Sequence, residues 1–525
     1  MAVRGFVAAG GLSREMTRAA LIRVLLAVAV ATATGVHEGY AQQPCTFACP
    51  PSRPAPTPGS PPSDSHRSDP WWIVGGVVVG LLGVVLAKQV FGDPGPPNPP
   101  TLPPLPPGGT PPLTQLSIDP PSPPRQGAGG AGGGGAGGGT TVQALRRGFD
   151  LPPLDAPHLN NECILDIPAN VSTATLDAIA ARHAMTRLES TTLRLTGRTL
   201  HRWRLDGGGS IADMIRTFAR SEPSVAGMQA QFIFKLSQTP PAQINGDQYA
   251  PQKLNLPEAH RLATGNRVLI AVIDSEVDAS HPDLAGAITA KFDATDKEKP
   301  HAHGTGMAGA IAGRRTVLGT APQVGLLTVN AFTTRANETE GTTFHILKGL
   351  DWAATQGARV VNMSFAGPAD PRLQDALLKA NRKGIVLIAA AGNAGPNSKP
   401  LFPAADPNVI AVTATDIDDG LFSGANRGKH IAVAAPGVEV LVPAPDGAYQ
   451  FTTGPSVAAA EVSGVAALLI ERNPSLKPAD VRRILTSTAK DLGPKGHDPG
   501  FGAGLVNAFK AVTAAGTGGR SQPGF

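Results

Sequence analysis

The second half of the chain, from about residue 248 to 515, alternates short apolar runs with helical patterns, and this alternation is the strongest constraint on the fold. The apolar runs are rich in Val and Ile without strict apolar–polar alternation, which is typical of strands covered on both faces. The expected strands are Val268–Ile273, Val324–Val329, Val360–Met363, Ile385–Ala389 and Val409–Val412, with helices between them such as Phe344–Thr355 and Pro371–Lys383. The pattern predicts an α/β fold with a doubly wound, mostly parallel sheet, whose ligands bind at the carboxyl ends of the strands.

Residues 142–244 read as a separate, smaller α+β domain. Its expected elements are a strand at Glu162–Ile167, a helix at Ser172–His183, two short strands within Thr192–Leu205, a helix at Ile211–Arg220 and a strand at Gly227–Leu236. The order βαββαβ is that of a ferredoxin-like fold. This order alone says nothing about chemistry.

The composition before this domain is unsuited to a folded core. Residues 1–41 combine basic, apolar and small residues, which predicts a secretory signal peptide, with an uncleaved anchor helix as the alternative. Residues 42–70 are Pro-rich, and the uncharged apolar stretch within 71–91 predicts a transmembrane helix. Residues 92–141 are rich in Pro and then Gly, which predicts a membrane-proximal stalk, and a disordered tail is expected at 516–525.

These segments predict a membrane-anchored protein of the cell envelope, with its C-terminal domain extracytoplasmic. The topology stays open at this point, because a cleaved signal followed by a stop-transfer helix would leave that domain in the cytoplasm. The charges that flank residues 71–91 are too sparse to decide between the two.

Charge and cysteine usage exclude several classes of function. A formal net charge of +5 without a Lys/Arg block gives no indication of a nucleic-acid partner. Three cysteines do not make a disulfide framework, and Cys163 stands far from the other two. The chain contains no His-Glu-x-x-His pattern and no Cys/His cluster, so no metal site is expected.

Four residues stand where a fold of this kind places chemistry. Asp274 closes an apolar strand, and His303 begins a helix of small residues that holds the imidazole by close backbone packing. Ser456 begins a second small-residue helix, where free N–H groups and the helix dipole stabilise a developing oxyanion. Asn393 follows a buried strand and offers an amide donor. Each alone has an ordinary structural explanation as a turn residue, a structural histidine or a helix cap, but the four together are far more specific.

With these segments the sequence resembles the subtilisin-like (subtilase) family of serine proteases, over a peptidase domain at residues 245–515. The family's three motifs are similar to Val272–Ser275, His303–Gly309 and Gly454–Gly464, and they occur in the subtilisin order Asp, His, Ser. The resemblance implies a serine endopeptidase that hydrolyses peptide bonds through an acyl-enzyme. Its triad would be Asp274, His303 and Ser456, with Asn393 as an oxyanion donor.

The resemblance also implies substrate-binding residues and partners. A peptide or protein substrate would bind as an added strand, and the residues similar to the family's two substrate walls are Ser364, Phe365, Ala366, Ala390, Ala391 and Gly392. The domain at 142–244 resembles the family's propeptide, which assists folding of the protease and inhibits it until it is cleaved. Calcium often stabilises this family, but no compact acidic loop is present to assign as its site.

Two departures from the family pattern motivate an alternative, a catalytically degenerate protein that only binds peptides. Glu276 replaces a glycine, and a positive φ there would cost roughly 1–3 kcal/mol of strain. A second carboxylate beside Asp274 would also favour protonated His303 and weaken it as a base. Pro455 replaces the Thr before the nucleophile and removes one N–H group. Glu461 and Gly306 replace histidines outside the triad, where we expect little effect.

Overall fold

The computed structural model describes residues 145–236, 248–296, 299–335 and 338–517. The predicted signal peptide, Pro-rich segment, transmembrane helix and stalk therefore lie outside the described residues, as does the tail beyond residue 517. Among the helices that the structure does describe, none combines the length and apolar character needed to cross a bilayer.

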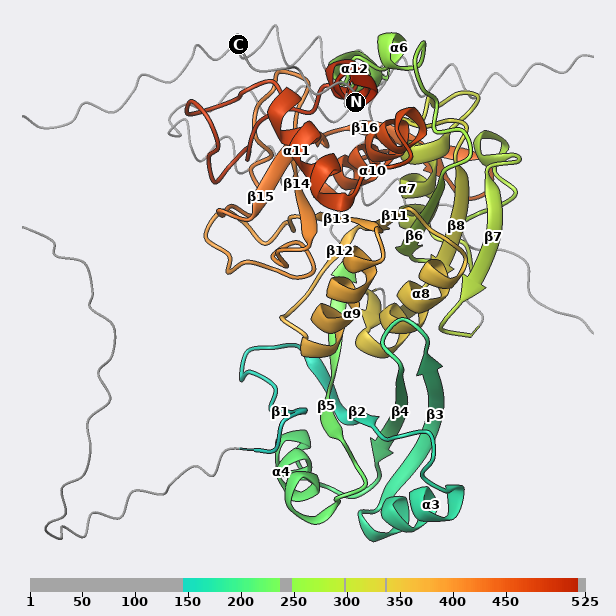
Figure 1. Cartoon of the computed structure of the whole chain (residues 1–525), viewed down its shortest axis with the longest axis vertical. Coiled ribbons are helices and arrows are strands. Elements are labelled where there is room, and N and C mark those ends of the chain that lie inside the picture. The colour runs from blue at the N-terminus through green and yellow to red at the C-terminus, as the bar shows by residue number, and fades with distance from the viewer. Residues whose placement is uncertain (1–144, 237–247, 297–298, 336–337, 518–525) are drawn as a thin grey trace, which may run out of the picture. The chain divides into compact units, whose positions relative to one another are not determined.

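A parallel sheet of seven strands forms the centre of the second half of the chain (Figure 1). In spatial order its strands are β15 (Ile431–Pro436), β14 (Val409–Thr415), β13 (Val386–Ala390), β11 (Val360–Met363), β6 (Leu269–Asp274), β8 (Gly325–Asn330) and β7 (Ile288–Asp293). Every neighbouring pair runs parallel. The five predicted strands are all present within this sheet, and the subtilisin-like α/β prediction is confirmed in this part of the chain.

Helices cover both faces of this sheet. The helices α8 (Thr343–Thr355) and α9 (Pro371–Arg382) lie on one face, and α7 (Ala302–Ala312), α10 (Pro455–Arg472), α11 (Pro478–Thr488) and α12 (Ala508–Thr517) on the other. The strand pleat explains the division, because successive side chains point to opposite faces. In β6, Ala271 and Ile273 join the core under α8 and α9, whereas Ile270 and Val272 join the core under α7 and α10.

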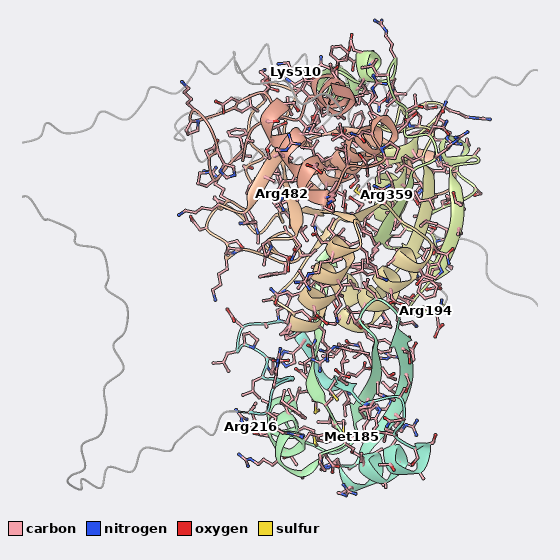
Figure 2. All side chains as sticks on the ribbon, in the orientation of Figure 1. Met185, Arg194, Arg216, Arg359, Arg482 and Lys510 are labelled. Carbon is pink, nitrogen blue, oxygen red and sulfur yellow. The ribbon has the colours of Figure 1, made fainter. Side chains whose placement is uncertain are left out.

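Short elements complete this part of the chain. They are α5 (Ala250–Lys253), α6 (Leu256–Ala259), the 3₁₀ turn Pro282–Leu284, and the hairpin of β16 (Val440–Ala444) and β17 (Ala448–Thr452). Two half-buried arginines labelled in Figure 2 donate hydrogen bonds to carbonyl oxygens of other segments. Arg482 of α11 donates to the Val409 carbonyl oxygen at 2.6 Å, and Arg359 donates to that of Pro474 at 3.2 Å.

The first described part of the chain contains six elements in the order strand, helix, strand, strand, helix, strand. They are β2 (His158–Asp166), α3 (Thr173–Arg182), β3 (Met185–Leu193), β4 (Arg198–Leu205), α4 (Ile211–Ser221) and β5 (Gly227–Leu236), preceded by the short β1 (Phe149–Asp150). The strands lie in the order β3-β4-β2-β5. Cys163 of β2 is a buried free thiol whose Sγ donates to the Trp203 carbonyl oxygen at 3.6 Å.

The bounds predicted for β3 were wrong. The sequence indicated two short strands within Thr192–Leu205, but the first of them begins at Met185. Only the two ends of β3 are buried, and its middle, Thr186–Thr192, is half-buried or exposed and is polar except for Leu188. Such a strand lacks the apolar alternation from which strands are read.

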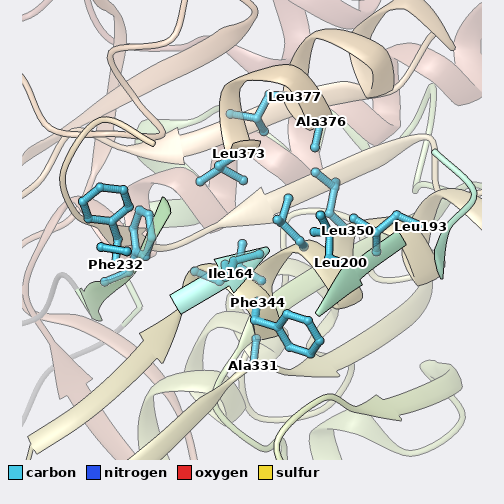
Figure 3. Close-up of a cluster of buried hydrophobic side chains, with 14 of the residues drawn as sticks. Ile164, Leu193, Leu200, Phe232, Ala331, Phe344, Leu350, Leu373, Ala376 and Leu377 are labelled. Carbon is cyan, nitrogen blue, oxygen red and sulfur yellow. The ribbon is translucent and has the colours of Figure 1, made fainter. Parts of the chain in front are cut away.

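Strand β5 continues beyond the first sheet and joins it to the second half of the chain. Its last residues pair antiparallel with β10 (Glu338–Thr342) on one side and with β12 (Phe365–Ala366) on the other, and β10 forms a hairpin with β9 (Phe332–Arg335). A continuous buried core lies between the first sheet and helices α8 and α9. Figure 3 shows Leu373, Ala376 and Leu377 of α9 with Ile164 and Leu200 in this core.

Helix α10 lies at the centre of one core. A pair of leucines, one buried in α10 and one partly exposed elsewhere, tests how much this core contributes to stability. Leu468 is fully buried, whereas Leu262 is 39% exposed. We expect Leu468→Ala to lower the free energy of unfolding by about 2–5 kcal/mol, because a buried cavity remains. Leu262→Ala should lower it by well under about 1 kcal/mol. Urea denaturation measures both, and equal losses would contradict this description of the core.

Candidate active site

Asp274 and His303 form a fully buried hydrogen-bonded pair. Asp274 ends β6, and its Oδ1 lies 2.7 Å from His303 Nδ1. The same oxygen accepts from the Ser275 backbone N–H at 2.7 Å and from the Ser275 hydroxyl at 3.1 Å. A carboxylate oxygen only accepts, so the imidazole carries its proton on Nδ1 and has a lone pair on Nε2. The imidazole is therefore oriented as a general base.

The position of His303 depends on a close approach between helix α7 and the end of β6. His303 is the second residue of α7, and the N-cap His301 accepts its backbone N–H through Nδ1 at 3.2 Å. The next residue, Gly304, donates its N–H to the Ser275 hydroxyl at 3.0 Å. A Cβ at Gly304 would lie 2.1 Å from the Ser275 carbonyl oxygen, so only glycine allows this approach.

Ser275 and His301 are two residues of this site that sequence analysis did not single out. The Ser275 hydroxyl also lies 3.2 Å from His301 Nδ1, and His301 Nε2 lies 3.3 Å from the Thr339 hydroxyl on β10. Burial lowers the pKa of His301, and the neighbouring His303 lowers it further. Ser275 lies in the first of the three motifs and His301 lies two residues before the second, but the sequence does not indicate their contacts.

Ser456 is the second residue of α10 and is almost fully buried. Its Oγ donates to the Ser364 carbonyl oxygen at 3.1 Å, and the Ser364 hydroxyl donates to the Ser456 carbonyl oxygen at 2.9 Å. Asn362 donates to the Ser364 hydroxyl at 2.9 Å and accepts from Ser463 at 3.1 Å. This reciprocal network fixes the start of α10 against β11 and β12.

The structure brings the helices of Ser456 and His303 together, but no hydrogen bond joins the two side chains. Helices α7 and α10 pack against each other. His303 Nε2 is buried and makes no hydrogen bond to any atom that the structure describes, while Ser456 Oγ is directed at Ser364. Catalytic hydrogen bonds are often long in the absence of substrate and tighten when it binds.

Asn393 lies in the loop that follows β13, and it is exposed to solvent. A fully buried residue that sequence analysis missed, Asn426, shapes this loop: its Oδ1 accepts from the Ala394 N–H at 2.8 Å, and its own N–H donates to the Gly392 carbonyl oxygen at 3.0 Å. Gly392 has a φ of 100°, and a Cβ there would lie 2.8 Å from Asn426 Nδ2. No local pattern in the sequence signals a contact between residues so far apart.

The predicted substrate wall at Ser364, Phe365 and Ala366 includes a strand edge that β5 occupies in this structure. Its β12 pairs with residues 235 and 236 of β5. The wall opposite β12 across β5 is β10, which sequence analysis did not identify. Of the residues predicted for the second wall, Ala390 pairs with Val412 inside the sheet, Ala391 donates its N–H to the Val412 carbonyl oxygen, and Gly392 accepts from Asn426. Their contact with a peptide stays a prediction.

The strain that a positive φ would cause at Glu276 does not arise. Glu276 is not among the described non-glycine residues with positive φ. Its carboxylate forms an ion pair with Lys291 of β7 at 2.5 Å, and its carbonyl oxygen accepts from the His301 N–H at 2.8 Å. The negative charge expected to act on the imidazole is therefore paired with a lysine.

Pro455 occupies the first position of α10, with Gly454 as N-cap at a φ of 149°. Proline suits this position, because the first N–H groups of a helix have no partner within the helix and the fixed φ is already helical. The replacement of Thr by Pro therefore agrees with the local structure, and Ser456 is not the helix cap that its sequence context allowed as an alternative.

Glu461 is buried in α10, one turn beyond Ser456, and its Oε2 has no hydrogen-bond partner among the described atoms. Burial raises the pKa of this carboxyl well above its ordinary value. Burial, and after it the nearby Glu461, raises the pKa of the Tyr249 hydroxyl, which donates to the Val438 carbonyl oxygen at 2.7 Å.

The structure offers no place to assign a metal ion. Within residues 145–236, 248–296, 299–335 and 338–517, no group of three or more His, Cys, Asp and Glu residues is arranged to hold one. The calcium suggested by the family resemblance therefore has no site assigned to it.

Comparison with known proteins gives the class. The model of the subtilase family matches residues 265–504. Thermitase from Thermoactinomyces vulgaris is 37% identical over 274 residues, which cover 50% of this chain and 95% of thermitase. Subtilisin E from Bacillus subtilis (strain 168) is 34% identical over 305 residues, which cover 56% of this chain and 77% of that protein. The crystal structure of fervidolysin from Fervidobacterium pennivorans, described as a keratinolytic enzyme related to subtilisin, aligns with a TM-score of 0.60 and 25% identity, over 69% of this chain and 62% of that one.

The chain therefore belongs to the subtilase family. Within that class it is a subtilisin-like serine endopeptidase, as its similarity to thermitase and the subtilisins indicates.

A pair of glycines in α7 tests the geometry of the Asp274–His303 pair. A Cβ at Gly304 meets the Ser275 backbone, whereas the nearest atom to one at Gly306 is a Val442 methyl group, at 2.9 Å, and the nearest backbone atom is the Pro443 oxygen, at 3.5 Å. We expect Gly304→Ala to lower kcat/KM by at least about 100-fold, because α7 must move away from β6. Gly306→Ala should lower it by less than about 10-fold. Similar losses for the two variants would contradict the argument.

Glu461 predicts a pH dependence of stability. Its pKa is raised in the folded state, so its stabilising contribution is present at low pH and is lost as the pH rises above the unfolded value. Between the unfolded-state pKa and the folded-state pKa of Glu461, each unit by which the pH rises lowers the free energy of unfolding by up to about 1.4 kcal/mol. Glu461→Gln cannot titrate, so we expect the wild-type Tm to fall relative to this variant between pH 5 and 8. The exposed Glu439→Gln is the control and should follow the wild-type dependence of Tm on pH. If the Tm of Glu461→Gln also stays parallel to that of the wild type over this range, the prediction is refuted.

Proposed function

We propose that Asp274, His303 and Ser456 act as the catalytic triad of this endopeptidase. The observation that carries the proposal is the buried 2.7 Å contact between Asp274 Oδ1 and His303 Nδ1, which leaves Nε2 without a partner among the described atoms. The histidine stands on a helix that packs against the helix of Ser456. A base of fixed tautomer therefore lies beside a serine at a helix N-terminus, which is the arrangement that nucleophilic attack on a carbonyl requires.

In this mechanism Ser456 Oγ attacks the scissile carbonyl carbon while His303 Nε2 takes the hydroxyl proton. Asp274 holds the tautomer and stabilises the imidazolium that forms. The tetrahedral oxyanion accepts hydrogen bonds from the Ser456 N–H and the Asn393 amide, near the positive end of the α10 dipole. His303 then gives the proton to the leaving amine, and water repeats the sequence on the acyl-enzyme. Ser456 must turn from the Ser364 carbonyl oxygen toward His303 when substrate binds.

We further propose that the domain at residues 142–244 is a propeptide of ferredoxin-like fold. The end of β5 fills the slot between β10 and β12, where an extended substrate would add as a strand. A buried polar network supports the same contact. Asp370 accepts from Gln229 of β5 at 3.1 Å, and Arg372 donates to Gln229 at 2.6 Å. An intact chain would thus be inhibited by its own N-terminal part until it is cut between about Leu236 and Gln252.

The localisation remains a proposal that rests on the sequence alone. The uncharged apolar stretch within 71–91 supports a membrane anchor, with the peptidase domain outside the cytoplasm and the Pro/Gly-rich segment as a spacer.

The test is the purified full-length chain beside its Ser456→Ala variant. We expect the wild type to convert itself to a shorter form, with the new terminus located by mass spectrometry, and to react with a fluorophosphonate. Ser456→Ala should do neither, because the nucleophile is absent. Asn393→Ala should process roughly 100- to 1,000-fold more slowly but still be labelled, because one oxyanion donor is lost. Undiminished processing or labelling of Ser456→Ala would remove Ser456 from this role.

A further inference from the structure

The end of β5 carries a lysine between two glutamates of the slot. Lys235 Nζ lies 2.7 Å from Glu338 Oε2 and 3.5 Å from Glu340 Oε1, and both glutamates stand on β10. We propose that Glu338 and Glu340 select substrates with a basic side chain at the position that Lys235 occupies. The inference rests on the proposed function and deepens it, because it names the class of peptide that the same slot prefers.

The strand register fixes which substrate residue faces the glutamates. Lys235 stands opposite Glu340 of β10 on one side and opposite Ala366 of β12 on the other. Position 235 of a bound strand is therefore defined by main-chain pairing on both edges. A substrate that adds to the same two edges in the same register places its corresponding side chain beside Glu338 and Glu340.

The two neighbouring positions face a different environment, because side chains alternate along a strand. Phe234 is fully buried and packs edge-on against Phe365, with ring centroids 5.8 Å apart. A Cβ at Gly367 would lie 2.3 Å from the Phe234 ring, so the glycine makes room for an aromatic residue. Leu236 is half-buried opposite Phe365. Only position 235 of these three presents a charge to β10, and the preferred pattern is aromatic, basic, aliphatic.

The side chains of Glu338 and Glu340 are at least partly exposed, so their charges are expected to discriminate between substrate side chains without adding much to the affinity. The side chains of Lys235 and Glu338 are 57% and 63% exposed, and that of Glu340 is 29% exposed. The hydrogen bond to Glu338 raises the pKa of Lys235, so the amine stays charged through the working pH range. Exposed pairs contribute little each, and salt screens them. A preference of about 3- to 10-fold for lysine over a neutral residue at low salt is therefore expected, with a larger discrimination against glutamate.

The experiment uses the self-processed form of the full chain and fluorescence-quenched peptides with the sequence of residues 231–244. Three peptides carry Lys, Gln or Glu at the position of Lys235. We expect kcat/KM to decrease in that order for the wild type, and the differences to shrink at 0.5 M salt, roughly a 4 Å Debye length. The variant with both Glu338→Gln and Glu340→Gln should cleave the three peptides within about 2-fold of one another. The exposed Glu439→Gln is the matched control and should keep the wild-type order.

Two outcomes would overturn the inference alone. One is a wild type that cleaves the three peptides equally well, and the other is a double variant that keeps the preference for lysine. A wild type that digests an unstructured protein such as casein but none of the peptides would also overturn it. A wild type that neither self-processes nor digests casein would overturn the proposed function, and the substrate preference with it.

Discussion

The close approach of helix α7 to the carboxyl end of β6 is the constraint on which the rest of the site depends. Asp274 and His303 meet in a fully buried hydrogen bond only because Gly304 lets the helix start directly on the Ser275 backbone. A buried carboxylate is costly unless it accepts hydrogen bonds. Asp274 Oδ1 accepts three from neighbours within the two segments, whereas Oδ2 has no partner among the described atoms. The Asp274 carboxylate thus holds the end of β6, the turn at Ser275 and the start of α7 together, and it is the same group that orients His303.

The sequence predicted the sheet well because strands covered on both faces are recognisable from apolar runs. All five predicted strands lie in the parallel sheet, and β11 has the predicted bounds Val360–Met363. The sequence missed β15, although all six residues of that strand are buried. Two other elements that it missed or misplaced lack an apolar run: the edge strand β7, whose side chains alternate between half-buried and exposed, and the mostly polar middle of β3. In both, pairing with a distant strand decides the structure, and no local pattern reports it.

The candidate active site also has residues that the sequence predicted and contacts that it did not. Asp274, His303 and Ser456 could be predicted because each sits at a strand end or a helix start within a run of small residues. The contacts that hold the start of α10 and the loop of Asn393 could not, since Ser364, Asn362 and Asn426 act on residues that are remote in the chain. The concern over Glu276 failed for a similar reason. Its partner Lys291 lies on β7, the strand that the pattern did not reveal.

The buried thiol of Cys163 has a consequence for the peptidase after processing. Burial raises the pKa of this thiol and keeps it from reacting, and the residue belongs to the part that cleavage after Leu236 would remove. The chain from residue 245 to 515 contains no cysteine at all. A released peptidase would therefore owe none of its stability to disulfide bonds, and reductants that unfold disulfide-bonded enzymes would leave it folded.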